Sequence, residues 1–279
     1  MNYVNSHHIK IIMRKIYTLS LILLTAFLFT QCTSKDAPIK DEKGKLREFP
    51  ETIEKMFAAH GGLERWKKMS TLEFDIYNSS DSSKMETHVL DLKTRSALIT
   101  GEGYKVGFDG NEAWVDNPAV FGDNQSPLFY HNLFFYFHSL PFLAGDPGIR
   151  FEEKKDKELV GKKYKVVSIK YEQGVGYSSE DEYLLYIDPS TYLLKYVLYT
   201  VTYFSNESSQ TYSALKYTAW ENIDNFYLPK GLEGYKYEMR DLGEERYKKT
   251  IINKSITSES RDSKIYSAPT GSKTEKPKS

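Results

Sequence analysis

The feature that most limits the fold is a long series of short strand-like segments around one apolar segment of helix length. Eleven segments are rich in β-branched and aromatic residues and are separated by turn residues, as in an antiparallel sheet with hairpin connections. Asp109-Gly110 is a strong hairpin signal, and Asp188-Pro189 and residues 222–225 also indicate turns. The predicted strands are 72–77, 85–92, 96–100, 104–109, 112–115, 164–171, 182–188, 193–204, 211–221, 232–240 and 247–257.

The apolar segment, residues 127–144, is PLFYHNLFFYFHSLPFLA. It is too long for a strand and is apolar nearly all round, which predicts a buried helix or a helix pair broken at Pro141. Residues 193–204 are apolar on both strand faces, so either a thick core covers both faces or one face lines a cavity. We therefore predict a mainly β fold with a few helices, in which one large curved antiparallel sheet wraps a central helical segment.

A helix is also expected at the start of the domain, near Phe49. Pro50 and Glu51 suit the first turn of a helix, and Gly61 and Gly62 suit its end. His60-Gly61-Gly62 is superficially similar to an oxyanion loop, but the chain has no G-x-S-x-G nucleophile motif. The helix-end interpretation is therefore favoured.

Residues 1–31 have the layout of a secretory signal. Arg14 and Lys15 precede an apolar run, residues 19–29, that is too short for a comfortable membrane span. Residues 1–12 are expected to be superfluous, because a start at Met13 gives a conventional signal. The run ends at Cys32, the only cysteine of the chain.

Cys32 and the three residues before it resemble the lipobox of bacterial lipoproteins, although Gln31 stands where that pattern has a small residue. The resemblance implies that Cys32 is lipidated and becomes the first mature residue. A plain secretory signal or an uncleaved anchor is the alternative. Residues 32–48 then form a flexible polar tether, 49–257 the folded domain, and 258–279 a polar, frayed C-terminal tail.

The charge balance disfavours a nucleic-acid partner. The whole chain has 38 Lys and Arg against 38 Asp and Glu, and the first 31 residues hold three cations and no acid. The mature chain would therefore be slightly acidic, without the clustered basic surface that nucleic acid requires. With its one cysteine lipidated, the domain would have neither a disulfide nor thiol chemistry.

The sequence offers little catalytic or metal-binding chemistry. It has no H-E-x-x-H or C-x-x-C pair, and its glycines at 101, 103 and 107 miss the dinucleotide-binding spacing. His131 and His138 would share one helix face, but a metal site would also need a residue such as His88 or Asp146. Buried hydrogen-bonded histidines or polar lining of a cavity are favoured. The prediction is no cofactor, no metal and no enzymatic activity.

Four stretches carry a family resemblance. HGGLERW at 60–66, followed by TLEF at 71–74, and LPFLAGDPG at 140–148 resemble an uncharacterised bacterial lipoprotein family. YIDPSTYLLK at 186–195 and WENIDNFYLP at 220–229 resemble strand-turn signatures of the LolA-like superfamily of outer-membrane lipoprotein carriers. The resemblance implies an unclosed β half-barrel around helices, with an apolar cavity for acyl chains and no catalytic residue.

The predicted function is that of a lipoprotein of the cell envelope, anchored in the outer membrane and facing periplasm or cell surface. Its partners would be the membrane, through the lipid anchor, and a lipid or lipoprotein ligand. Binding is expected to be nearly insensitive to salt, because no charge cluster is expected beside the lining. The expected cavity lining is Phe129, Phe134, Phe137, Leu140, Phe142, Tyr196, Leu198 and Phe204.

Two alternatives stay open. A cell-surface interaction or glycan-binding module would present aromatic side chains in a row, and Trp66, Trp114 and Trp220 are the residues to inspect. A hydrolase that uses carboxylates has only scattered Asp and Glu residues in its favour. Buried tryptophans would favour the cavity and exposed ones the glycan-binding surface.

Overall fold

The computed structural model describes residues 49–172, 180–203 and 211–277, which belong to one unit, Phe49–Ser279. Cys32 and Phe204 therefore lie outside the described residues. The helices are α2 (Glu51–His60), α3 (Leu63–Trp66), α4 (Pro118–Phe121), α5 (Pro127–Leu143) and the 3-10 helix η1 (Ser263–Tyr266). The strands are β1 (Thr71–Asn78), β2 (Asp81–Asp91), β3 (Ala97–Gly101), β4 (Tyr104–Phe108), β5 (Ala113–Val115), β6 (Ile149–Leu159), β7 (Lys162–Tyr171), β8 (Glu182–Ile187), β9 (Leu194–Tyr199), β10 (Ser213–Tyr217), β11 (Trp220–Ile223), β12 (Phe226–Pro229), β13 (Gly231–Glu238), β14 (Asp241–Thr257) and β15 (Lys273–Glu275).

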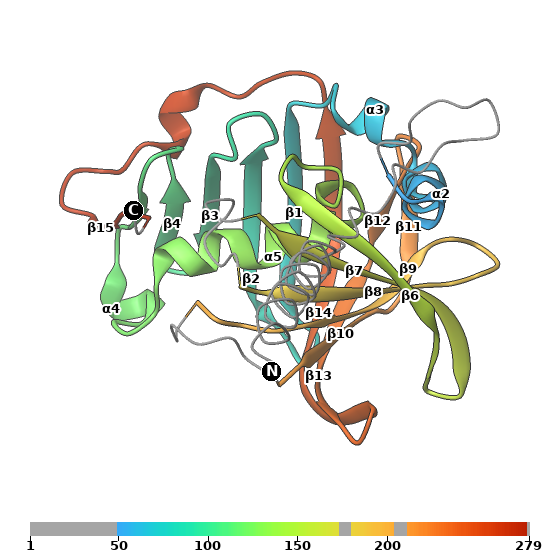
Figure 1. Ribbon diagram of the computed structural model, residues 1–279. Coiled ribbons are helices and arrows are strands. Elements are labelled where there is room, and N and C mark those ends of the chain that lie inside the picture. The colour runs from blue at the N-terminus through green and yellow to red at the C-terminus, as the bar shows by residue number, and fades with distance from the viewer. Residues whose placement is uncertain (1–48, 173–179, 204–210, 278–279) are drawn as a thin grey trace, which may run out of the picture. The chain divides into compact units, whose positions relative to one another are not determined.

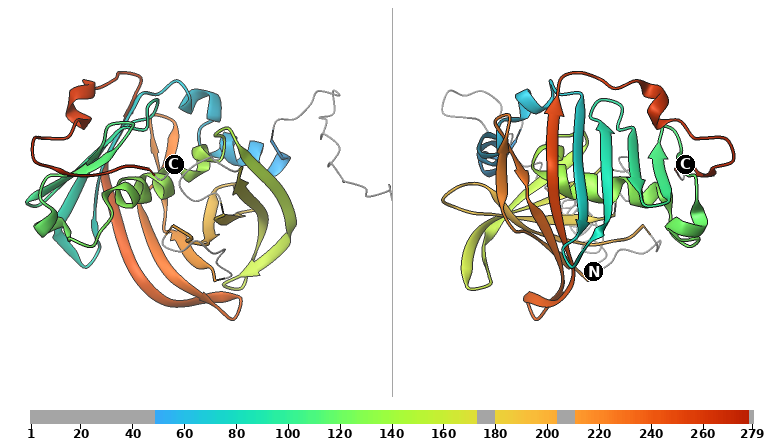
Figure 2. Two further views of the ribbon diagram at one scale, coloured as in Figure 1. Left: turned by 60° about the vertical axis from the view of Figure 1, so that its left-hand side comes forward. Right: turned by 180° about the vertical axis from the view of Figure 1, so that it is seen from behind.

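One large antiparallel sheet organises this unit. Its strand order is β15-β5-β4-β3-β2-β1-β14-β13-β10-β9-β8-β7-β6, and β11 and β12 form a separate hairpin. The outer strands β15 and β6 do not pair with each other, so the described sheet is not closed into a barrel. Figure 1 and Figure 2 show the sheet curving around α5, which lies on its inner side. The predicted fold class is confirmed.

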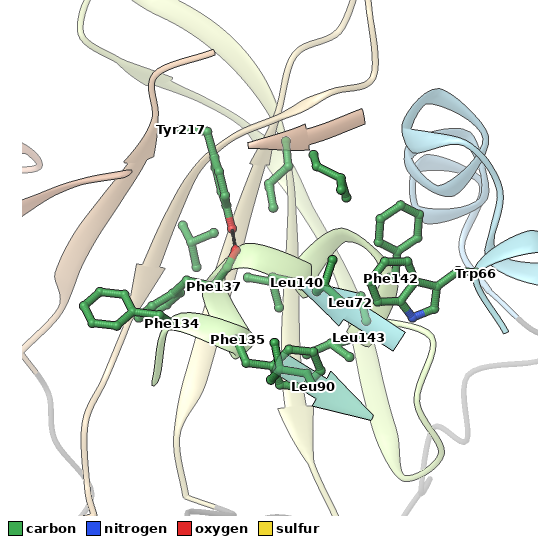
Figure 3. Close-up of a cluster of buried hydrophobic side chains, with 14 of the residues drawn as sticks. Trp66, Leu72, Leu90, Phe134, Phe135, Phe137, Leu140, Phe142, Leu143 and Tyr217 are labelled. Carbon is green, nitrogen blue, oxygen red and sulfur yellow. Dashed lines mark hydrogen bonds between the residues drawn. The ribbon is translucent and has the colours of Figure 1, made fainter. Parts of the chain in front are cut away.

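Helix α5 is continuous, so of the two predicted alternatives the single buried helix is confirmed and the helix pair broken at Pro141 is wrong. The Ser126 hydroxyl caps its start by accepting a hydrogen bond from the Phe129 N–H over 3.0 Å. Pro141 cannot donate to the carbonyl four residues earlier, which is that of Phe137. The Tyr217 hydroxyl donates to this carbonyl instead, over 2.7 Å (Figure 3). A strand side chain thus replaces the missing helical hydrogen bond.

The predicted ends of the first helix and of the hairpins are confirmed. Helix α2 ends at His60, and Gly61 follows with a φ of 117°. A side chain there would approach the Asn225 carbonyl to 2.3 Å, so the position requires glycine. In the β4–β5 turn, the Asp109 carboxylate accepts hydrogen bonds from the N–H groups two and three residues later. The Asp188 carboxylate accepts the corresponding pair between β8 and β9.

Sequence patterns missed strand β6 and the order in the C-terminal tail. Strand β6, IRFEEKKDKEL, is at the edge of the sheet and mostly exposed, so it can carry many charged residues. These residues leave no alternation of apolar and polar side chains by which a strand is recognised. The tail is not frayed through residue 277, contrary to expectation. Strand β15 pairs with β5, Tyr266 is buried, and its carbonyl accepts a 2.7 Å hydrogen bond from the Trp114 indole.

Apolar side chains cluster on both faces of the sheet. The larger cluster lies on the inner face and contains most of α5 with Leu72, Leu90 and Val197 (Figure 3). A second cluster on the opposite face contains Tyr196 and Leu198. Strand β9 is therefore apolar on both sides because it belongs to two cores.

Candidate functional site

A pocket of about 310 Å³ lies between α5 and the first or last residues of strands β7, β8 and β9. Its volume is at the lower end of the range for small-molecule sites. The lining is mainly aromatic and aliphatic, with an ion pair and a few hydroxyl groups at its margins. The lining residues are Arg95, Phe108, Leu128, Phe129, His131, Asn132, Leu133, Phe135, Tyr136, Phe137, Leu143, Asp146, Tyr171, Asp181, Tyr183, Tyr199, Thr200, Val201 and Tyr203.

Three tyrosines form one wall of the pocket. The hydroxyl oxygens of Tyr136 and Tyr171 are 2.5 Å apart and share a hydrogen bond, and the Tyr183 ring lies 5.1 Å from the Tyr136 ring. Burial raises the pKa of all three phenols, so they remain neutral at physiological pH. This wall combines aromatic surface with uncharged polar tips.

An ion pair lies at another margin of the pocket. One guanidinium nitrogen of Arg95, Nη2, is 2.8 Å from both carboxylate oxygens of Asp146. Burial raises the pKa of the Asp146 carboxyl, and the nearby Arg95 opposes that rise. The guanidinium also lies 5.4 Å from the centre of the Phe135 ring. The expectation that no charge cluster accompanies the lining is wrong, because Arg95, Asp146 and Asp181 all line the pocket.

The structure separates seven of the eight predicted lining residues into groups, and Phe204 lies outside the described residues. Phe129 and Phe137 line the pocket, whereas Phe134, Leu140 and Phe142 are buried in the inner core and do not. Tyr196 and Leu198 lie on the opposite face of β9, away from α5. Strand β9 meets α5 through Tyr199, whose ring lies 4.8 Å from that of Phe137, and through Val197.

Sequence reasoning missed the tyrosine wall and the Arg95–Asp146 pair. Alternation along β9 places Tyr199 and Val201 on the face opposite Leu198, whereas the predicted lining uses the Leu198 face as the inner one. No local pattern joins Arg95, in the β2–β3 turn, to Asp146, just after α5. Asp146 was considered only as a metal ligand. It lies in the 140–148 stretch, where a side chain at Gly145 would collide with the Leu63 side chain.

The histidines of α5 are buried side chains of the core. His131 bonds the Pro127 carbonyl through Nδ1 at 3.2 Å and stacks on Phe108. The ring of His138 stacks on Phe74 at 4.4 Å. Burial lowers the pKa of His131 to about 4 and that of His138 to about 3. Among the described residues, no three His, Cys, Asp or Glu side chains are placed to hold a metal ion.

The tryptophans do not form an exposed row. Trp66 and Trp114 are buried, and Trp220 is half-buried against His60 and Tyr217. By the criterion stated above, this favours the cavity over a glycan-binding surface. In the described part of the chain, no helix is long and apolar enough to cross a membrane.

Residues 111–229 match the model of a family of unknown function (DUF6503). This range contains α5 and strands β7–β9 of the pocket, but neither Arg95 nor Phe108. The comparison with curated proteins gives no match.

Three similar solved structures are all distant relatives in sequence. A LolA superfamily protein from Nitrosomonas europaea is 10% identical, with 72% of this chain and 89% of that chain covered and a TM-score of 0.42. A DUF1329 family protein from Desulfovibrio piger is 11% identical, with 74% and 93% covered and a TM-score of 0.43. A domain named as an outer membrane lipoprotein-sorting protein, from Vibrio parahaemolyticus, is 11% identical, with 74% and 97% covered and a TM-score of 0.40. The superfamily indicated by the motifs is thus represented among similar structures, but such distant likeness supports no argument about the site.

Proposed function

We propose that the domain binds an apolar or amphipathic ligand, such as a lipid with one acyl chain, in the pocket between α5 and strands β7–β9. The observation that carries the proposal is the aromatic pocket of about 310 Å³ on the inner side of the sheet. Removing apolar ligand surface from water contributes about 25 cal/mol for each Å². Association costs offset much of this gain, so we expect affinities in the micromolar range.

The polar groups around the pocket support binding without catalysis. The hydroxyl groups of Tyr136 and Tyr171 are hydrogen-bonded to each other, and the Arg95 guanidinium donates a hydrogen bond to the Asp146 carboxylate. The Asp181 carboxylate accepts hydrogen bonds from the Thr202 N–H and the Thr200 hydroxyl. These groups hold one another in place and shape the cavity, whereas a nucleophile would need an adjacent base.

Filling the pocket should abolish binding while leaving the fold intact. Val201 lines the pocket and its side chain is partly exposed, so Val201→Trp places a large ring there without entering the core. We expect its affinity for a fluorescent lauroyl probe to fall at least tenfold, in a titration of the purified protein.

Val120→Trp is the matched control, because Val120 is exposed on α4 and does not line the pocket. It should bind the probe like the unmodified protein, and both variants should keep the melting temperature within about 3 °C. Equal binding by Val201→Trp and Val120→Trp, or no binding by the unmodified protein, would refute the proposed function.

We further infer that lipid on Cys32 holds the protein at the outer membrane, on the strength of the signal layout and the lipobox resemblance. Cys32→Ala should prevent acylation and shift the protein to the soluble envelope fraction, or block its maturation. Cell fractionation and the mass of the N-terminal peptide test this. An unchanged distribution together with an unmodified peptide in the wild type would contradict it.

A further inference from the structure

A second, smaller cavity shares the Arg95–Asp146 ion pair with the aromatic pocket. Its volume is about 180 Å³, and the two residues line both cavities, so the cavities meet at this pair. The smaller cavity brings together three cations and one carboxylate, in contrast to the aromatic pocket. Its lining residues are Leu63, Trp66, Lys67, Met69, Leu92, Lys93, Arg95, Phe142, Gly145 and Asp146.

The local backbone fixes the position of Arg95. The Asp91 carboxylate accepts hydrogen bonds from the N–H groups of Lys93 and Thr94, at 2.8 and 2.9 Å, and the Asp91 carbonyl accepts one from Arg95. Arg95 itself has a φ of 65°, in the left-handed region. This closed turn holds the backbone of Arg95 where its side chain reaches both cavities. Ligand binding therefore costs little conformational entropy of Arg95.

The guanidinium of Arg95 retains donors for a ligand. Both hydrogen bonds to Asp146 come from Nη2, and within residues 49–172, 180–203 and 211–277 the nitrogens Nε and Nη1 make none. An arginine fork is suited to the planar oxygens of a carboxylate or phosphate. Lys67 and Lys93 add two further cations beside it.

The lysines can turn toward a bound anion. Lys67 Nζ lies 2.9 Å from the exposed Glu64 carboxylate, a surface pair that contributes little to stability. Lys93 Nζ donates to the Lys67 carbonyl. Moving either ammonium group therefore breaks only one solvent-exposed interaction. The small cavity carries a net charge of +2, counting its three cations and Asp146.

We propose that the ligand is an amphiphile with an anionic headgroup: its acyl chain occupies the aromatic pocket and its headgroup contacts Arg95, Lys67 and Lys93. This inference rests on the proposed function, because it assumes that the aromatic pocket holds a chain. A carboxylate and a phosphate monoester share the recognised chemistry. Binding then depends on salt, unlike binding to the apolar lining alone.

Isothermal titration of the purified full chain with three lauroyl probes tests the proposal. 1-Lauroyl-lysophosphatidate and 1-lauroylglycerol differ only in the phosphate, and laurate supplies a carboxylate. At low salt we expect at least one anionic probe to bind about tenfold more tightly than the glycerol ester, and the gap should narrow as salt rises. A preference for lysophosphatidate over laurate identifies a phosphate headgroup, the reverse identifies a carboxylate, and equal binding shows that the site accepts either anion.

Arg95→Gln should remove most of this gap, because it deletes the guanidinium that contacts the headgroup. Lys93→Gln, which leaves the ion pair intact, should reduce the gap about twofold, and it keeps the test valid should Arg95→Gln unfold. Lys84→Gln removes the same charge from an exposed position on β2 and should change nothing. If all three probes bind equally, or if Lys84→Gln acts like Lys93→Gln, the anionic headgroup is refuted while the proposed function stands. If no probe binds, the proposed function itself fails.

Discussion

Lowering the pH from 7 to 5 should destabilise the folded domain by several kcal/mol. Burial lowers the pKa of His60 and His131 to about 4 and that of His138 to about 3. The unfolded chain takes up these protons near pH 6.5, whereas the folded chain does not, so stability falls as the pH falls through this window. Each histidine contributes up to about 1.4 kcal/mol per pH unit between its two pKa values. The three together therefore contribute up to about 4 kcal/mol per pH unit.

Carboxylates act in a separate, more acidic window. The pKa of Glu233 is lowered to about 2; burial opposes this shift, and its hydrogen bonds with Lys216, Lys248 and Tyr235 outweigh the burial. The stability that Glu233 contributes is therefore present above its unfolded pKa, near 4, and is lost only below it. Destabilisation between pH 6.5 and 5 should accordingly come from the histidines.

Urea unfolding at pH 7, 6 and 5 measures this loss, and His138→Phe is the informative variant. His138 Nε2 is buried and has no hydrogen-bond partner among the described residues, and its ring stacks on Phe74. Phenylalanine keeps the stacking and cannot be protonated, so the variant should match the wild type at pH 7 and lose about a third of the pH dependence. A wild-type stability that stays constant from pH 7 to 5 would contradict the expectation.

Phe142→Ala should cost about 3–5 kcal/mol of stability without altering the aromatic pocket between α5 and strands β7–β9. The Phe142 ring stacks on Trp66, with centres 4.2 Å apart and planes 3° from parallel, and the Phe226 ring meets it edge-on at 5.7 Å (Figure 3). It is almost completely buried, so alanine would leave a cavity where α5 meets α3. Chemical denaturation measures the loss directly.

Phe129→Ala is the comparison, because Phe129 lines the pocket and is only half-buried. We expect it to lower stability by about 1 kcal/mol and to weaken binding of a lauroyl probe more than Phe142→Ala does in its folded state. Similar stability losses for the two variants would show that the division between core and pocket is wrong.

The sequence predicted the architecture because its strongest signals are local. Each signal sets the local structure at the place where it occurs. The turn residues Asp109-Gly110 and Asp188-Pro189 set hairpin turns, and the apolar run of α5 sets a buried helix. The sequence could not decide between a single helix and a pair broken at Pro141, because the hydrogen bond from Tyr217 that completes the helix is a tertiary contact. Strand β6 was missed because an exposed edge strand carries charges on both faces.

The site was only partly predictable, because it depends on which face of each strand points inward. Both faces of β9 are apolar, so Tyr196 and Leu198 could not be distinguished from Val197 and Tyr199 by composition. Of the seven described candidates, the pocket contains only Phe129 and Phe137. The Arg95–Asp146 pair joins residues 51 positions apart, so no local sequence motif predicts it.

Photolabelling tests the central claim most directly. A lauroyl probe carrying a diazirine, irradiated with the purified protein, should label residues 128–137 of α5 and residues 199–203, which begin at the end of β9. Competition by unlabelled 1-lauroylglycerol should remove the label, and Val201→Trp should prevent it. Saturable labelling confined to the opposite face of β9, at Tyr196 or Leu198, or no saturable labelling at all, would contradict a ligand pocket between α5 and the sheet.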